Sequence, residues 1–378
     1  MSVTVCIAAS TLYYPEGGGH MWVYLNWALG FMSNGCKVIW MEEIKPSAGR
    51  KKNLQLISIL QRKLQDYGLQ DNIALWQSGG TGLDENYSEI GIDVETAAVQ
   101  SDILLNQDYV MPFLIIRHFR KSVLLDIDPG LLQMWITKDA LHIAPHNFYF
   151  TTGETVGVPG SRIPSCGLKW IYTPPCVSLE HWPKAGFSNK AAFTTVTHWS
   201  GNGYEEYNGQ PYPNDKRDGF LPFISLPKYT SVPLELAILL SNDEIVEEQT
   251  LLQQNGWSVK DSHKVAGTPA AYQQYIKNSA GEFSCVKPSC LFLQNAWISD
   301  RTLCYLASGK PAVVQNTGAS NFLPDADGLL RFKNFTEALK LLEKVAVDYD
   351  KQSERAHALA KEYFDAKKIT RNLLEKVL

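Results

Sequence analysis

The sequence predicts an α/β protein of two domains, each built around a doubly wound parallel sheet with helices on both faces. The chain has 378 residues, and a domain typically has ~100–200. Hydrophobic residues make up 45% and charged residues 20%, a composition that forms a large core and excludes wholesale disorder. Apolar strand-like runs alternate with runs of helical spacing, and this alternation is typical of parallel sheets.

The first half reads as a β-α-β unit that continues into further strands. Residues 3–9 form an apolar strand that runs into Gly17-Gly18-Gly19-His20. Apolar residues then recur at helical spacing over residues 22–32, and Gly35 stands where a helix would end. We expect further strands at residues 37–41, 72–76, 102–105 and 122–127, and a helix near residues 53–67.

The second half restarts after residues 172–183, where three prolines indicate a connection. We expect strands at residues 191–196, 234–240, 282–286 and 311–315, and helices at residues 299–307, 335–344 and about 350–378. The predicted divisions are an N-terminal domain of residues 1–175, a second domain of residues 176–350, and a C-terminal helix of residues 351–378. Ligands bind at the carboxyl ends of strands in such sheets, so two tandem domains are expected to place their turns across one cleft.

Charge and cysteine content argue against several classes of partner and site. The 35 basic and 39 acidic residues give a net charge of -4, which argues against nucleic acid as a partner. No stretch approaches the ~20 apolar residues that cross a bilayer, and the N-terminus lacks the basic flank of a signal peptide. Seven scattered cysteines without a paired zinc spacing predict reduced thiols, a cytoplasmic location and no zinc site. We expect no metal, although a cation at Asp126-Ile-Asp128 stays open. The oligomeric state stays open.

The glycine run that ends in His20 is the first candidate site. Gly18 and Gly19 allow a ligand to approach the backbone closely, and the N-terminus of the following helix favours the negative charge of a diphosphate. The His20 imidazole can take a proton from a hydroxyl near neutral pH. The alternatives are a tight turn and a histidine that only hydrogen-bonds the backbone.

The segment of residues 297–318 is the second candidate. Ser299 or Asp300 can cap a helix that ends near Gly309, and Arg301 can bind a diphosphate in bidentate fashion. The alternative is an ordinary N-cap beside a solvated arginine.

Carboxylates at the ends of first-half strands form a third group. Asp126 and Asp128 end an apolar strand, so they can orient or deprotonate an acceptor, or stabilise an imidazolium at His20. Glu154 follows another short strand and is a further candidate for acceptor contact. A polar turn before Pro129 is the structural alternative.

Two motifs carry a resemblance to a known family. His20, followed fifteen residues later by Gly35-Cys36-Lys37-Val38, resembles the opening of inverting nucleotide-sugar glycosyltransferases of the GT-B fold. There a Gly-His pair begins the first helix and a Gly-His-x-Val sequence ends it; here Cys36 replaces the second histidine. The run Ala307-Ser-Gly-Lys-Pro-Ala-Val-Val resembles the end of the donor-site helix of the same fold. Retaining members usually carry two glutamates where this chain has Ala296 and Cys304. They share a similar Gly-Gly opening without the histidine base, so the stereochemical outcome stays open.

The resemblance implies two Rossmann-like domains that face each other across a cleft, with the last helix crossing back onto the first domain. It implies transfer of a sugar from a nucleoside diphosphate sugar to a small-molecule or glycan acceptor, without a metal or another cofactor. His20 would be the base. The donor-side residues would be Thr197, Lys216, Glu282, Lys287, Ser299, Asp300 and Arg301, with Lys216 offsetting charge on the leaving diphosphate. A structural salt bridge is the alternative for Glu282 and Lys287.

Three other functions stay open from the sequence. A sugar-nucleotide epimerase of the same fold needs a diphosphate site but no acceptor. An NAD(P)-dependent oxidoreductase can be built on similar sheets, although the G-x-G-x-x-G fingerprint is missing. A module that binds sugar nucleotides without catalysis is the third.

Overall fold

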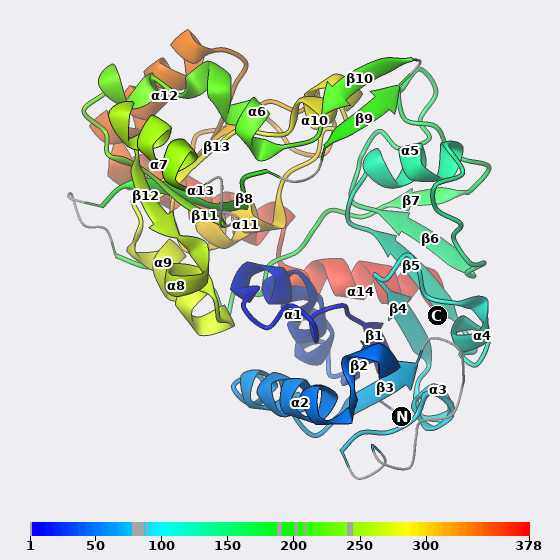
Figure 1. Cartoon of the computed structure of the whole chain (residues 1–378). Helices are drawn as coiled ribbons and strands as arrows, with labels where there is room; N and C mark the ends of the chain where they lie inside the picture. The colour runs from blue at the N-terminus through cyan, green and yellow to red at the C-terminus, as the bar shows by residue number, and fades with distance from the viewer. Residues whose placement is uncertain are drawn as a thin grey trace. The chain divides into compact units, whose positions relative to one another are not determined.

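The computed structural model describes residues 2–77, 87, 90–186, 191–200, 203–207, 209–239 and 245–378. The chain forms two compact units (Figure 1). Unit 1 comprises Met1–Pro159, Ile163–Ser178 and Ala366–Leu378, and unit 2 comprises Gly160–Arg162 and Leu179–Asp365. Each unit contains a parallel sheet with helices, so the predicted α/β class is confirmed.

Unit 1 is built on a seven-stranded sheet in the part of the chain that the structure describes. The strand order is β3-β2-β1-β4-β5-β6-β7, and all neighbours pair in parallel. The inner strands β1, β4 and β5 are almost entirely buried because both faces of the sheet are covered. The strands are β1 (Thr4–Ala8), β2 (Lys37–Ile44), β3 (Ile73–Gln77), β4 (Ile103–Asn106), β5 (Ser122–Asp126), β6 (Phe148–Thr151) and β7 (Trp170–Tyr172).

The helices of unit 1 cover both faces of this sheet. Helix α1 packs on the face that carries Trp40, whose ring meets Tyr24 of α1. Helices α3 and α4 pack on the opposite face, in a core that includes Cys6 and Leu104. The helices are α1 (Gly18–Ser33), α2 (Arg50–Gln65), α3 (Val94–Gln100), α4 (Phe113–Ile116), α5 (Leu131–Thr137) and α14 (Ala366–Val377), with a 3-10 turn at Pro46–Ala48.

Helix α14 lies beside α1 in unit 1, although the two helices are at opposite ends of the sequence (Figure 1). Gly30 makes this approach possible. A Cβ at Gly30 would lie 2.8 Å from Cγ2 of Thr370 and 2.9 Å from the backbone oxygen of Ala366. Asn34 at the end of α1 also donates to the backbone oxygen of Lys367 over 2.8 Å. The final helix is therefore an integral part of unit 1.

Unit 2 is built on a six-stranded parallel sheet in the order β12-β11-β8-β13-β14-β15, as far as the structure describes it. Its core is strongly aromatic, and Phe283 and Phe332 stack with ring centroids 5.3 Å apart. An antiparallel hairpin, β9 with β10, lies outside this sheet. The strands are β8 (Phe193–His198), β9 (Tyr204–Tyr207), β10 (Gln210–Pro213), β11 (Leu234–Leu239), β12 (Ser258–Asp261), β13 (Gly281–Ser284), β14 (Ala312–Gln315) and β15 (Leu329–Phe332).

The helices of unit 2 include the one that the sequence placed at a donor site, α11. Ser299 caps it, with Oγ accepting from the backbone N–H of Arg301 over 3.3 Å. The helices are α6 (Lys216–Phe220), α7 (Ile245–Gln254), α8 (Ser262–Ala266), α9 (Pro269–Asn278), α10 (Pro288–Leu293), α11 (Asp300–Ala307), α12 (Phe335–Val347) and α13 (Tyr349–Tyr363), with 3-10 turns at Leu221–Phe223 and Leu226–Lys228.

The C-terminal stretch differs from the single long helix that we expected. It consists of α13, which packs on α11 within unit 2, and α14, which packs on α1 within unit 1. The break falls at Phe364 and Asp365, where the buried Phe364 ring packs near Phe322. Among the helices that the structure describes, none combines the length and the apolar character needed to cross a membrane.

Candidate functional site

Unit 2 contains a pocket at the carboxyl ends of β13, β14 and β15, beside the start of α11. It is an open depression, and the empty space in it, with the open solvent above it included, is about 440 Å³. Three basic side chains line it, Lys216, Arg301 and Arg331, and no acidic side chain lines it among the residues that the structure describes. Its position follows the general rule for ligand sites in open α/β sheets. Arg301 and Arg331 are ion-paired with Glu282 and Asp325, whereas Lys216 donates to a backbone oxygen, so the lining indicates an anionic ligand chiefly at Lys216.

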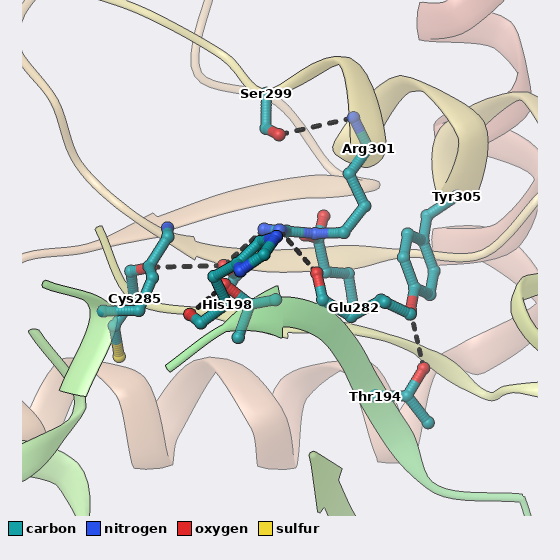
Figure 2. Close-up of polar contacts among 11 residues, drawn as sticks. Thr194, His198, Glu282, Cys285, Ser299, Arg301 and Tyr305 are labelled. Carbon is teal, nitrogen blue, oxygen red and sulfur yellow. Dashed lines mark hydrogen bonds and ion pairs between the residues drawn. The ribbon is translucent and has the colours of Figure 1, made fainter. Parts of the chain in front are cut away.

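Arg301 projects from α11 toward Glu282 of β13 (Figure 2) and is one of the residues that line this pocket. Its Nε donates to Glu282 Oε1 over 2.7 Å. Its Nη1 donates to the backbone oxygen of Val196 over 3.1 Å, and its Nη2 donates to Ser284 Oγ over 2.7 Å. Burial disfavours the charge, but the Glu282 carboxylate outweighs this and raises the pKa of Arg301 above its usual value. Arg301 is therefore not the solvated arginine of the alternative interpretation.

Glu282 lies below Arg301 on β13 and is fully buried. One carboxylate oxygen forms the ion pair with Arg301, and the other has no hydrogen-bond partner among the described residues. The structure thus shows the salt bridge that we considered for this glutamate. The pair links β13 to the first turn of α11 and fixes the wall of the pocket.

Lys216 begins α6 and enters the pocket from the loop that follows the β9–β10 hairpin. Its Nζ donates to the backbone oxygen of Cys285 over 2.7 Å. Burial, with a further contribution from the nearby charge of Arg301, lowers the pKa of Lys216 to about 7. An anion bound in the pocket would place a compensating negative charge next to this ammonium.

The remaining donor-side candidates lie near the pocket, but they do not line it. Thr197 is at the carboxyl end of β8, and its Oγ1 donates to the backbone oxygen of His198 over 3.0 Å. Asp300 is the first residue of α11, and Lys287 precedes α10. The structure therefore brings Lys216, Ser299 and Arg301 together in the pocket wall, with Glu282 beneath them.

Arg331 and Gln315 are pocket residues that the sequence reasoning missed. Arg331 projects from β15 and donates to Asp325 and to the backbone oxygen of Leu323. Gln315 ends β14, and its side-chain oxygen accepts from the backbone N–H of Val286 over 3.0 Å. Each is a single polar residue in an apolar strand, so the sequence offers no spacing that distinguishes it.

His20 belongs to unit 1, in the first turn of α1, and is half-buried. Its Nε2 lies 2.9 Å from the backbone oxygen of Ser10. Because a carbonyl oxygen only accepts, Nε2 carries the proton, and Nδ1 of the neutral ring has the lone pair. The ring is flanked by Tyr24, edge-on at 5.3 Å, and by Tyr14 at 5.8 Å. His20 therefore does hydrogen-bond the backbone, in a way that leaves one nitrogen basic.

The loop between β1 and α1, which leads to His20, is held by a carboxylate that the sequence reasoning did not identify. Glu42 on β2 is 1% exposed and accepts from the backbone N–H groups of Thr11 and Leu12 and from the Trp40 indole N–H. Thr11 Oγ1 also donates to Glu42. Gly18 and Gly19 are the first residues of α1 in the same unit and do not contribute to the pocket of unit 2.

Asp126 ends β5, Asp128 follows two residues later, and the Tyr109 hydroxyl contacts both carboxylates. Asp126 is fully buried and accepts from Gln133 over 2.9 Å and from Thr151 Oγ1 over 2.8 Å. Burial raises its pKa to about 7. The Tyr109 hydroxyl lies 3.2 Å from Asp128 Oδ2 and accepts from the backbone N–H of residue 128 over 3.1 Å.

The strand register places Asp126 on the sheet face opposite α1. Asn106 pairs with Leu124 and Asp126 with Thr151, so Asp126 shares a face with Asn106, Leu124 and Cys6, away from Trp40 and α1. The hydrogen bonds of Asp126 indicate that its carboxylate stabilises the turn after β5. Glu154 is half-buried, three residues beyond β6. Within the described ranges, no group of three or more His, Cys, Asp or Glu side chains is placed to hold a metal ion.

No family model matches the chain, and no curated protein matches it. Solved structures do share its fold. An alpha-glucosyltransferase in complex with UDP-glucose and DNA containing an abasic site is 11% identical, with a TM-score of 0.59 over 100% of this chain and 99% of that one. HepE from Anabaena in complex with UDP and glucose is 12% identical, with a TM-score of 0.59 over 99% of both chains. A glycosyltransferase from Rickettsia africae is 10% identical, with a TM-score of 0.55 over 99% of this chain and 97% of that one. These likenesses confirm the predicted GT-B-type fold.

Proposed function

We propose that the chain is a glycosyltransferase that moves a sugar from a nucleoside diphosphate sugar to a hydroxyl of an acceptor. The observation that carries the proposal is the pocket of unit 2, with its three basic side chains and no acidic one among the described lining residues. A departing nucleoside diphosphate gains negative charge as the glycosidic bond breaks. A fixed positive environment stabilises that charge more than it stabilises the intact donor.

In this proposal, Lys216 is the main contact for the diphosphate. Lys216 lines the pocket and its ammonium donates one hydrogen bond, to the neutral backbone oxygen of Cys285, which leaves two N–H groups for phosphate oxygens. Arg301 supplies charge from the pocket lining while its ion pair with Glu282 keeps it in place. These cations make a metal ion unnecessary for charge neutralisation, and the nucleotide sugar is the only co-substrate that we propose.

The comparisons support UDP as the first nucleotide to test. Two structures that share the fold are complexes, one with UDP-glucose and the other with UDP and glucose. One of those proteins was solved with DNA, whereas this chain carries a net charge of -4, so we propose a small-molecule or glycan acceptor here. All seven cysteines lie within the described residues and none forms a disulfide, which supports a reducing, cytoplasmic environment.

We assign the acceptor-activating role to His20 in unit 1. With Nε2 donating to Ser10, Nδ1 is the nitrogen that can take the proton of the attacking hydroxyl. Glu42 contributes indirectly, because its hydrogen bonds to Thr11 and Leu12 hold the loop between β1 and α1. Asp128 and Glu154 are proposed as acceptor contacts on the same unit.

A thermal-shift and calorimetric screen of nucleoside diphosphates tests the donor half of the proposal. We expect UDP to raise the melting temperature of the wild type, since a ligand that binds only the native state stabilises it. Lys216→Met should weaken UDP binding at least tenfold, and Lys340→Met, at an exposed lysine of α12, should not. If no nucleoside diphosphate binds, the proposal is wrong. Release of UDP that depends on a second substrate separates a transferase from an epimerase.

A further inference from the structure

Helix α2 gives unit 1 a strongly basic surface. The chain as a whole has a net charge of -4, but the segment from residue 44 through residue 65 contains no acidic residue and six basic ones: Lys45, Arg50, Lys51, Lys52, Arg62 and Lys63. Within the described residues of unit 1, the ion pairs join Arg120 to Asp102 and His142 to Asp139, so none of them neutralises α2. This part of unit 1 therefore attracts polyanions.

The cations of α2 project into solvent, away from the buried face of the helix. Lys51, Lys52 and Arg62 are exposed, whereas Leu60 and Leu64 are buried. Lys51 and Arg62 are eleven residues apart, which is about three helical turns, so both lie on the same side of the helix. The helix thus presents a row of positive charges along its length, which suits an extended anionic surface better than a single small anion.

An apolar depression borders this basic helix. It lies between α2, the start of α1 and the loop that joins β1 to α1, and the empty space in it, with the open solvent included, is about 260 Å³. Leu56, Ile59 and Leu60 of α2 line it, and no acidic side chain does so among the residues that the structure describes. Lys63 lines it as well and donates to the backbone oxygen of Pro15. A ligand in this depression would contact hydrocarbon next to a cation.

The depression lies within one stripe of α2. Positions 52, 56, 59 and 63 are separated by four, three and four residues, so their side chains follow one another along the same side of the helix. Lys52 and Lys63 stand at the two ends of this stripe, with Leu56 and Ile59 between them. Glu16, an exposed residue of the β1–α1 loop, offsets part of the charge of Lys63. The stripe is therefore apolar in the middle and cationic at both ends.

The row of cations and the apolar depression together select the class of partner. Anionic phospholipids supply negative head groups and hydrocarbon at the same surface, and basic amphipathic helices bind bilayers through both. A nucleic acid supplies the charge without the hydrocarbon, and α2 has no aromatic side chain on which a base could stack. The observations therefore favour a lipid surface.

We propose that α2 docks unit 1 onto the surface of a bilayer that contains anionic phospholipids, with an apolar lipid group in the depression beside Leu56 and Ile59. This binding is peripheral, because it uses one face of a helix that packs on unit 1 with its other face. It does not depend on the proposed function, since no nucleotide takes part in it.

Sedimentation of the full chain with lipid vesicles tests this docking. The vesicles contain either phosphatidylcholine alone or equal parts of phosphatidylcholine and phosphatidylglycerol. We expect at least tenfold tighter binding to the anionic vesicles. Raising the salt concentration from about 0.1 M to about 0.5 M should release the protein, because salt screens exposed charges. Equal binding to both kinds of vesicle, or no binding to either, would overturn the proposal.

Removal of charge from α2 tests the assignment to this helix. Each lysine or arginine near an anionic bilayer strengthens binding roughly fivefold. A triple variant with Lys51→Gln, Lys52→Gln and Arg62→Gln should therefore bind the anionic vesicles roughly 100-fold more weakly. Ile59→Gln should weaken the same binding at least threefold, because it removes an apolar side chain from the depression. A triple variant that binds like the wild type would refute the role of α2.

A matched control removes the same number of exposed cations from unit 2. The variant with Lys228→Gln, Lys333→Gln and Lys340→Gln should bind the vesicles like the wild type, and an equal loss in both triple variants would show that only net charge matters. Duplex DNA that binds through α2 more tightly than the anionic vesicles would also contradict the proposal. Both triple variants should keep the melting temperature and the UDP affinity of the wild type, so docking and nucleotide binding are judged separately.

Discussion

Arg301 and Glu282 form a buried ion pair in unit 2, with Nε 2.7 Å from Oε1 and side chains that are 12% and 0% exposed. Arg301 comes from the first turn of α11 and Glu282 from β13. The pair thus fastens the helix start to the sheet edge and sets the position of the pocket wall. Arg301, which the sequence suggests as a phosphate-binding residue, therefore also has a structural role through its ion pair with Glu282.

Replacing Arg301 by methionine should destabilise the protein strongly. Glu282 would remain as an uncompensated buried charge, and breaking one side of such a pair costs about 3–5 kcal/mol. Urea unfolding followed by circular dichroism measures this loss. The double variant Arg301→Met with Glu282→Met should recover most of the stability, since both charges leave together. A single variant as stable as wild type would show that the ion pair contributes nothing.

The low pKa of Lys216 predicts that UDP binding takes up a proton above neutral pH. In the protein without ligand, Lys216 has a pKa of about 7, and a bound diphosphate should raise this pKa. The titration of Lys216 alone leaves the affinity for UDP constant below pH 7. Above pH 7 the affinity falls as pH rises, by at most about tenfold per pH unit. Calorimetry at pH 8 in buffers of different ionisation enthalpy should show uptake of up to about one proton. Lys216→Met should abolish that uptake, and a wild type that binds UDP at pH 8 without uptake would contradict the assignment.

The sequence predicts the sheets well where strands are buried on both faces. Such strands are apolar runs, as in β1, β4 and β5, and they can be located without a structure. The edge strand β12 reads Ser-Val-Lys-Asp and the hairpin β9–β10 contains no apolar run. Neither gives a strand signal, because exposed strands need few apolar residues.

The site was predictable where motifs mark it and not elsewhere. Ser299 and Arg301 stand at a helix start that the sequence identifies, Lys216 follows the long turn after β8, and the structure places all three in the lining of one pocket. Arg331 and Gln315 are single polar residues in the apolar strands β15 and β14, and only the structure shows where they lie. Asp126 was expected to face an acceptor, but the register turns it to the opposite side of the sheet from α1.

Gly30→Ala should destabilise unit 1, although alanine favours helices over glycine by about 1 kcal/mol. The new Cβ would meet Thr370 at 2.8 Å and the backbone oxygen of Ala366 at 2.9 Å, and overpacking of this kind costs about 1–3 kcal/mol. Because the backbone atoms of α14 cannot move without shifting the helix, we expect the steric cost to exceed the gain in helix propensity. The melting temperature should fall for Gly30→Ala and not for Gly186→Ala, where nothing lies within 4 Å. Equal stability of both variants would show that α14 tolerates displacement.

His20→Ala should lower kcat by roughly 10²–10⁴, the usual contribution of a general base. His20→Gln should do the same, because an amide can still donate to the Ser10 oxygen but has no basic nitrogen. This pair of variants separates proton transfer from support of the loop, since only alanine removes the hydrogen bond. Initial rates of UDP release at saturating donor and acceptor measure the effect, with the exposed His142→Ala as the control. If His20→Gln retains the wild-type rate while His20→Ala loses it, the imidazole holds the loop and another group takes the proton.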